Sequence, residues 1–362
     1  NDSLLISEIR SNKNLIRIHA DQMLIPASIL KLFTALVAMN ALGEDYHFHT
    51  DFFSDPHKNL KIKGHGDPLI ISEMIPEMIR QIGDQIPEIN DIILDDTHFQ
   101  SPMIIPGATK NSTQPYDAPN GSLCVNFNTV FFKKDQNGKY ISAEPQTPLL
   151  PFVLDRITRS SLDQGRIILS DNNQEHLLYA GYIFKHFLER KVPVKGIVRQ
   201  GIIDKNHDTL ILRYRSPFSL QDIIRKMLYY SSNFTANQIL LAAGAAKHGE
   251  PGTLAKGIQV AQEYTATHRG LSEIQFQEGS GLSTLNRLSA RMMGQILKEF
   301  FPYRNLLKKE GRAFYKTGTL TGVRSRAGYL QTRTGKLLSF VVILNSNPNS
   351  MENIMKQIHH FY

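Results

Sequence analysis

The sequence predicts an α/β (α+β) fold, in which an antiparallel sheet covered by helices is interrupted by a large inserted α+β domain. Two observations predict this fold. Residues 1–48 contain a hairpin-like pair of strands and a helix, and residues 213–362 contain helices followed by a series of strands. Residues 49–212 differ, because short alternating strands, turn signals and proline-rich loops predominate there. We therefore expect residues 1–48 and 213–362 to form one discontinuous domain, with residues 49–212 inserted into it.

The first segment predicts a hairpin and then a helix. Residues 4–9 and 14–20 have the apolar pattern of two paired strands. A helix is expected to begin at Pro26, because proline fits the first turn of a helix and residues 32–39 form an apolar run without glycine.

The later elements follow from the same patterns. In the insert, strands are expected near residues 52, 62, 92–94, 197–198 and 209–214, helices over 70–83 and 179–190, and long loops over 101–120 and 144–151. In the last segment, helices are expected over 219–230, 234–247, 252–268, 289–301 and 351–360, and strands over 314–319, 324–333 and 336–345. Short turns between these last strands predict antiparallel pairing.

Composition indicates a soluble globular protein, since 41% of the 362 residues are hydrophobic and 20% are charged. The longest apolar stretch, near residues 32–43, is too short to span a bilayer, so no transmembrane segment is expected. A net charge of +8 favours polyanionic surroundings, but the basic residues are scattered and do not predict nucleic-acid binding.

The cysteine and histidine content limits which disulfides and metal sites the chain can form. The single cysteine, Cys124, excludes an internal disulfide and a cysteine-based zinc site, and we expect it to be a small buried apolar residue. The thirteen histidines show no His-Glu-x-x-His or other metal-binding spacing, so no metal and no cofactor is expected.

Three short motifs carry the chemistry. Ser28 and Lys31 are three residues apart, so on a helix they share a face, and a desolvated lysine can take the proton of a serine nucleophile. Downstream follow a Ser-Ser-Asn segment at Ser231–Asn233 and a Lys-Thr-Gly segment that begins at Lys316. Each motif alone is weak, but the ordered triple is the set found in penicillin-binding proteins and class A β-lactamases.

The chain resembles the D-alanyl-D-alanine carboxypeptidase/endopeptidase family, the class C low-molecular-mass penicillin-binding proteins. Besides the triple, residues 64–68 resemble the family's Gly-x-Gly-Asp-Pro turn, and residues 95–99 its Asp-Asp-Ser-x-Phe segment. Residues 278–283 resemble its Asp-Gly-Ser-Gly-Leu-Ser loop. The resemblance implies a penicillin-binding/β-lactamase-like transpeptidase domain, which would be built from residues 1–48 and 213–362.

The resemblance also implies the activity: a serine D-Ala-D-Ala carboxypeptidase, possibly also a D,D-endopeptidase, acting on peptidoglycan stem peptides and acylated by β-lactams. Catalysis is expected from Ser28, Lys31, Ser231, Asn233 and Lys316. Thr317, Gly318 and Thr319 are expected to bind the substrate. The implied location is periplasmic or otherwise extracytoplasmic. Because residues 1–3 lack the pattern of a signal peptide, an exported mature or truncated chain is expected, with a cytoplasmic location as the alternative.

Two other functions stay open at this point. One is a catalytically weak, peptidoglycan-binding scaffold, and the other is a β-lactamase. The β-lactamase is disfavoured because Ser28 and Ser231 are 203 residues apart (231 − 28) and no Glu-x-x-Leu-Asn segment is present. The chain also departs from the family pattern at Asn237, where an acidic residue is usual, and at Glu278, where aspartate is usual.

Overall fold

The computed structural model describes residues 2–11, 13–170 and 172–362. The chain divides into two compact units. The first unit comprises residues 1–45, 220–247 and 254–362, and the second comprises residues 46–219 and 248–253. The second unit thus includes the short segment 248–253, which the sequence analysis had assigned to the last part of the chain. That the units are separate folding domains stays a prediction.

The first unit is built on one six-stranded sheet with the order β11-β12-β13-β14-β1-β2, in which every neighbouring pair is antiparallel. The strands are β1 (Asp2–Glu8), β2 (Asn14–Ile18), β11 (Lys308–Glu310), β12 (Ala313–Leu320), β13 (Val323–Gln331) and β14 (Leu337–Leu344). The two ends of the chain meet in this sheet, because β1 pairs with β14 from Asp2↔Leu344 to Glu8↔Leu338. The expected antiparallel sheet is confirmed.

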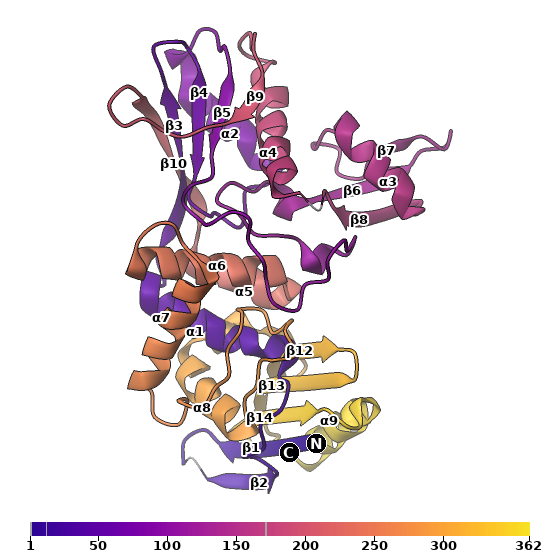
Figure 1. The fold of residues 1–362 in the computed structure, drawn as a ribbon. Helices are drawn as coiled ribbons and strands as arrows, with labels where there is room; N and C mark the ends of the chain where they lie inside the picture. The colour runs from indigo at the N-terminus through magenta and orange to yellow at the C-terminus, as the bar shows by residue number, and fades with distance from the viewer. Residues whose placement is uncertain (1, 12, 171) are drawn as a thin grey trace. The chain divides into compact units, whose positions relative to one another are not determined.

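Helices cover both faces of this sheet (Figure 1). On one face lies α8, which contacts β1 and β14. On the other face α9 packs against the alternate residues Phe340, Val342 and Leu344 of β14. Because both faces are covered, β14 is apolar almost throughout, as buried strands are. The helices of this unit are α1 (Lys31–Leu42), α5 (Leu220–Tyr230), α6 (Asn233–His248), α7 (Leu254–Thr267), α8 (Ala290–Phe300) and α9 (Met351–Phe361).

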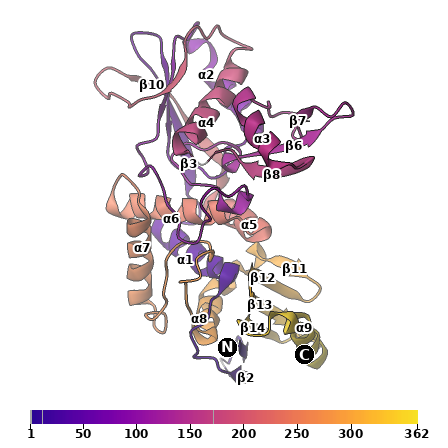
Figure 2. The ribbon, with the colours of Figure 1, turned by 45° about the vertical axis from the view of Figure 1, so that its right-hand side comes forward.

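Helix α1 is central in the first unit. It lies among the other helices of this unit (Figure 2) and contacts α5, α7 and α8. Residues 31–39 are all buried. A helix that is buried all round is apolar all round, which explains the run that the sequence analysis singled out. Lys31 is the charged exception, and its side chain has no exposure to solvent.

The second unit contains a mixed five-stranded sheet of order β10-β3-β4-β5-β9 and a three-stranded sheet of order β7-β6-β8. In the larger sheet β10, β3 and β4 are antiparallel, whereas β4, β5 and β9 are parallel. Its strands are β3 (His47–Ser54), β4 (Leu60–Gly64), β5 (Ile92–Asp95), β9 (Val198–Gln200) and β10 (Thr209–Ser219). Helices α2 (Ile75–Ile82) and α4 (Asn173–Leu188) contribute to its core.

The three-stranded sheet was not predicted. It consists of β6 (Thr129–Lys134), β7 (Tyr140–Ser142) and β8 (Gln164–Ile168), with α3 (Leu154–Ser160) between β7 and β8 in the chain. These strands are short and partly exposed, so their alternation of apolar and polar residues is weak. Cys124 is buried in this unit as expected, and burial raises the pKa of its thiol to about 12.

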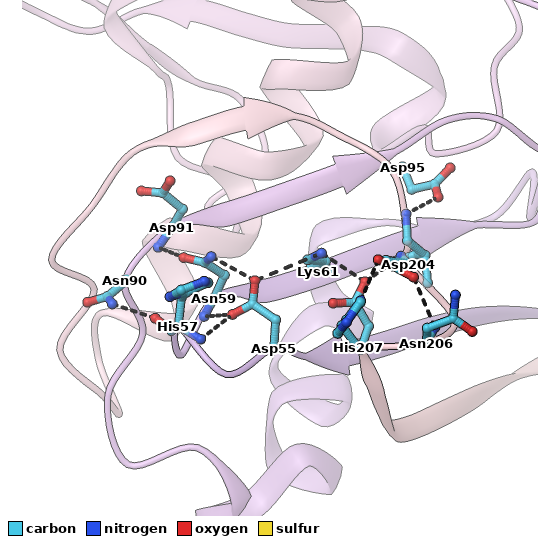
Figure 3. A network of polar contacts seen from close by, with 12 residues as sticks. Asp55, His57, Asn59, Lys61, Asn90, Asp91, Asp95, Asp204, Asn206 and His207 are labelled. Atoms are coloured by element: carbon cyan, nitrogen blue, oxygen red, sulfur yellow. Dashed lines mark hydrogen bonds and ion pairs between the residues drawn. The ribbon is translucent and has the colours of Figure 1, made fainter.

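A polar network ties the strand connections of the larger sheet together (Figure 3). The amine of Lys61 on β4 lies 2.8 Å from the Asp208 carboxylate and 3.8 Å from that of Asp55. Asp55 also accepts hydrogen bonds from the backbone and side-chain nitrogens of Asn59. These contacts fix the loop between β3 and β4 against the segment that leads into β10.

No helix in the described part of the chain has both the length and the apolar character needed to cross a membrane.

Candidate active site

The first motif forms a tight turn rather than the start of an α-helix. Residues Ala27–Leu30 form a 3-10 helix, and α1 begins only at Lys31. In a 3-10 helix residues three apart eclipse each other, and the Lys31 amine accordingly lies 2.9 Å from the Ser28 hydroxyl. Ala27, the residue before Ser28, has a φ of 50°, in the left-handed region that costs energy for a residue with a side chain. The predicted contact between Ser28 and Lys31 is therefore present, in a different backbone geometry.

The Lys31 amine has two further partners, both of which can only accept hydrogen bonds. It donates to the side-chain oxygen of Asn233 (2.8 Å) and to the backbone oxygen of Ser280 (2.7 Å). Burial lowers the pKa of Lys31 well below its usual value, the positive charge of Lys316 lowers it further, and Glu278 partly opposes both effects. A neutral amine has two N–H groups, which these two oxygens occupy. Its remaining lone pair then faces Ser28, whose hydroxyl can donate to it.

The second and third motifs meet through Lys316. Its amine lies 2.8 Å from the Ser231 hydroxyl and also donates to the backbone oxygen of Thr317 (2.8 Å). Burial lowers the pKa of Lys316 to about 8. Ser231 lies between α5 and α6 with a φ of 56°, a second strained position beside a hydroxyl group of the site. Asn233 is the first residue of α6, which places its side chain at Lys31.

Strand β12 passes close to the Ser28 turn. A Cβ atom on Gly318 would lie 2.9 Å from the backbone nitrogen of Ser28, so only glycine permits this approach. The side chains of Thr317 and Thr319 are exposed. Strand β11 pairs only with residues 313–315, so the edge of β12 from residue 316 to 320 has no strand partner on that side among the described residues. This free edge can accept an extended peptide.

A buried carboxylate organises the loop that touches Lys31. Glu278 has no exposure to solvent, and both of its carboxylate oxygens accept hydrogen bonds from neighbours in the first unit. The donors to its two oxygens are Ser280 N (2.7 Å), Ser280 Oγ (2.6 Å), Asn237 Nδ2 (3.0 Å), Asn286 Nδ2 (2.9 Å) and Ser283 N (3.2 Å). A Cβ atom on Gly281, whose φ is 81°, would collide with the backbone of Ala27. The loop thus presents the Ser280 carbonyl to Lys31 at a fixed position.

Glu278 and Asn237, the two departures from the family pattern, are direct hydrogen-bond partners. The Asn237 amide nitrogen donates to Glu278, and its oxygen accepts from the backbone nitrogen of Gly279 (2.6 Å). An acidic residue at position 237 would place a second carboxylate at hydrogen-bond distance from a buried one, which is unfavourable when both are ionised. Both residues stand out in the sequence, but the sequence does not pair them, because they are 41 positions apart.

Asn237→Asp is expected to destabilise the protein in a pH-dependent way. Two neighbouring buried carboxyl groups share a proton, so their folded-state pKa rises above the unfolded value of about 4. The variant's loss in free energy of unfolding is then small at pH values below the unfolded-state pKa. The loss grows as the pH rises towards the folded-state pKa and reaches on the order of 3 kcal/mol. We expect Asn237→Asp to lower Tm more at pH 8 than at pH 5. In Asn237→Ala, the matched control, the decrease in Tm should be similar at pH 5 and pH 8. If Asn237→Asp also shows equal decreases in Tm at the two pH values, the two carboxyl groups do not share a proton.

Comparisons with known proteins agree on the family. The model of the D-Ala-D-Ala carboxypeptidase 3 (S13) family matches residues 1–308 and 303–362. The D-alanyl-D-alanine carboxypeptidase of Actinomadura sp. (strain R39) is 24% identical over 90% of this chain and 74% of its own length. The D-alanyl-D-alanine carboxypeptidase DacB of Haemophilus influenzae is 22% identical over 95% of this chain and 85% of its own length.

The crystal structure of penicillin binding protein 4 (dacB) from Haemophilus influenzae superposes with a TM-score of 0.79 at 19% identity, over 96% of this chain and 90% of that one. The shared fold and the match over the whole chain lead to one conclusion: the chain belongs to the D-Ala-D-Ala carboxypeptidase 3 (S13) family, and it is a serine-type hydrolase of the penicillin-binding fold.

Proposed function

We propose that the chain removes the terminal D-alanine of peptidoglycan stem peptides through an ester on Ser28. One observation carries the assignment of the nucleophile: the Lys31 amine contacts Ser28 while it is fully buried and bonded to two acceptor oxygens. An amine held in this way favours its neutral form, which is the form that can take a proton.

In the first half of the reaction, Lys31 accepts the Ser28 proton as Oγ attacks the carbonyl between the two D-alanines. The new C–O bond forms as the carbonyl oxygen takes the negative charge. The backbone N–H groups of Ser28 and Thr319 are proposed to donate to this oxygen, and the close approach of Gly318 to Ser28 supports that arrangement. The Asn233 amide is proposed to hold the substrate backbone as well as Lys31.

When the oxyanion re-forms the carbonyl, the C–N bond between the two D-alanines breaks, and the leaving D-alanine needs a proton on its nitrogen and a partner for its carboxylate. Ser231 and Lys316, 2.8 Å apart, are proposed to relay the proton. Lys316 with the hydroxyls of Thr317 and Thr319 would receive the carboxylate at the free edge of β12. Water then hydrolyses the ester and restores the Ser28 hydroxyl. Cleavage of a cross-linked stem peptide would use the same steps, with a larger amine as leaving group.

β-Lactams are proposed to acylate the same serine. A second structure of the Haemophilus influenzae protein is a complex with a β-lactam (TM-score 0.72, 19% identity, 96% of this chain and 90% of that one). The ring-opened β-lactam has no small group that can leave, so its ester should persist. We also propose a periplasmic or otherwise extracytoplasmic location, because the substrate is found there.

The test of function is mass spectrometry of a stem peptide ending in D-Ala-D-Ala. The purified chain should release one alanine, and a peptide ending in L-Ala should remain intact. Penicillin binding without D-Ala release or cross-link cleavage would favour the scaffold, and rapid turnover of penicillin would favour a β-lactamase.

We further propose that the second unit is an inserted domain that the acylation reaction does not need. All the motif residues belong to the first unit. Within that unit the Gln221 backbone nitrogen donates to the Glu44 oxygen (3.2 Å), so a short linker can join residue 45 to residue 220. A variant with such a linker in place of 46–219 is expected to keep measurable penicillin acylation and to lose cleavage of peptidoglycan. If the variant unfolds cooperatively but cannot be acylated, the second unit helps to build the catalytic site.

A further inference from the structure

The second unit contains a cluster of three histidines and two carboxylates that the proposed reaction does not use. His49 and Asp51 lie on β3, and His65 follows β4 directly. The His65 ring stacks on His49 with 4.0 Å between centroids and meets the His98 ring edge-on at 4.9 Å. Glu250, from the segment 248–253 of the same unit, completes the cluster through His98.

Asp51 orients His65. Both Asp51 oxygens accept hydrogen bonds from the Arg213 guanidinium (2.7 and 2.8 Å), so this carboxylate is already neutralised. The same Asp51 is 3.1 Å from Nε2 of His65. With Nε2–H donated to a carboxylate, Nδ1 of His65 retains its lone pair. A histidine that ligates a metal is commonly held in this way by a carboxylate on its other nitrogen.

Three side chains remain as ligands: His65, His98 and Glu250. Each offers an atom within 4.8 Å of the other two, and Nδ1 of His98 is 2.9 Å from the Glu250 carboxylate. Ligand atoms around a tetrahedral zinc ion lie about 3.3 Å apart, as bonds of about 2.0 Å require. Small side-chain movements would therefore suffice. The Glu250 side chain is 46% exposed, which leaves a route for an ion and a coordination position for water.

Buried backbone contacts hold the three segments in place. The carbonyl oxygen of Ser122 accepts a hydrogen bond from the backbone nitrogen of Gly66 (2.8 Å). The hydroxyl of Ser122 accepts one from the backbone nitrogen of Phe99 (2.7 Å). The segment of Glu250 is attached as well, because the Gly252 nitrogen donates to the His98 oxygen (2.8 Å). The backbone positions of the three ligand segments are thus held before any ion binds.

We propose that His65, His98 and Glu250 bind a divalent transition-metal ion such as Zn²⁺, with Asp51 as the carboxylate that orients His65. Two imidazoles and one carboxylate form a donor set that suits zinc. In the sequence, His65 and His98 occupy the variable positions of the Gly-x-Gly-Asp-Pro and Asp-Asp-Ser-x-Phe patterns. Because they are 33 residues apart (98 − 65) and Glu250 is a further 152 residues away, no local spacing revealed the site.

Charged neighbours influence the affinity of the proposed site for a metal ion. The Lys63 amine is 3.3 Å from the Glu250 carboxylate and competes with a cation for it, and Arg213 adds positive charge behind Asp51.

The test is calorimetric titration of the untagged, full chain with Zn²⁺, together with the visible absorption spectrum of the Co²⁺ form. We expect one ion per chain and a rise in Tm on binding, because the ion binds the folded state. His98→Ala and Glu250→Gln should each weaken binding at least tenfold. His207→Ala, which removes an exposed histidine of the same unit, should not change it. Lys63→Gln should tighten binding, because it removes the competing cation.

Other results would overturn the proposal. If the wild-type chain binds no Zn²⁺, the cluster is a hydrogen-bonded ion-pair network only. If binding persists unchanged in both His98→Ala and Glu250→Gln, the ion is held elsewhere, for example by His359 and His360. The Glu250 side chain is 46% exposed, so Glu250→Gln should fold, and cooperative unfolding of each variant checks this.

Discussion

Penicillin is expected to add its own mass to the protein, and Ser28→Ala is expected to abolish the adduct. Ser28 is the hydroxyl in contact with the fully buried Lys31 amine. Removing a nucleophile of this kind lowers turnover by about six orders of magnitude, so D-Ala release should fall below detection. Intact-mass measurement gives the adduct, and digestion of the labelled protein should locate it on the peptide that contains Ser28.

Ser232→Ala is the matched control for this experiment. Its hydroxyl lies between Ser231 and Asn233 in the sequence, but it bonds to Thr235 (2.9 Å) at the start of α6. Loss of this contact should cost some stability and leave the site of labelling unchanged. Labelling that survives in Ser28→Ala would show that another residue is the nucleophile.

The rate of acylation is expected to depend on pH through two lysines. In the proposed mechanism acylation needs Lys31 neutral, so the rate should fall at low pH as this amine gains a proton. The same mechanism needs Lys316 charged, and burial lowers the pKa of Lys316 to about 8. Above that pH Lys316 loses its charge, so the rate should fall again. The two lysines interact, since the charge of Lys316 lowers the pKa of Lys31, and the two apparent pKa values therefore belong to the pair.

Two substitutions separate the roles of these lysines. Lys31→Arg should slow acylation by about 10²- to 10⁴-fold, because a guanidinium stays protonated and cannot act as the base. Lys316→Arg keeps its charge, so whatever activity remains should no longer decline above pH 8. Rates of labelling with a fluorescent penicillin between pH 5 and pH 10 give both profiles. A wild-type rate that stays constant above pH 8 would contradict the role of Lys316, and near-normal acylation by Lys31→Arg would mean that Lys31 only packs.

Parts of the fold were readable from local patterns. The first and last segments carry strong periodicity, so the hairpin, the last three long strands and helix α9 (Met351–Phe361) lie close to where they were expected. The parallel pairing of β4, β5 and β9 was not predictable, because it depends on which distant strands meet. Short, half-exposed strands such as β7 (Tyr140–Ser142) carry too few residues for a pattern to form.

The sequence by itself determined which groups we propose to react: a serine and a lysine three residues apart, and two further motifs in a fixed order. A short motif is a local property of the chain, so it can be recognised without knowledge of the fold. Only the tertiary structure decided how these groups can act. The Ser280 carbonyl reaches Lys31 across 249 residues, and the buried network of Glu278 holds that carbonyl in place. Burial and partner choice set the proton affinity of an amine, and both arise from packing between segments that are far apart in the chain.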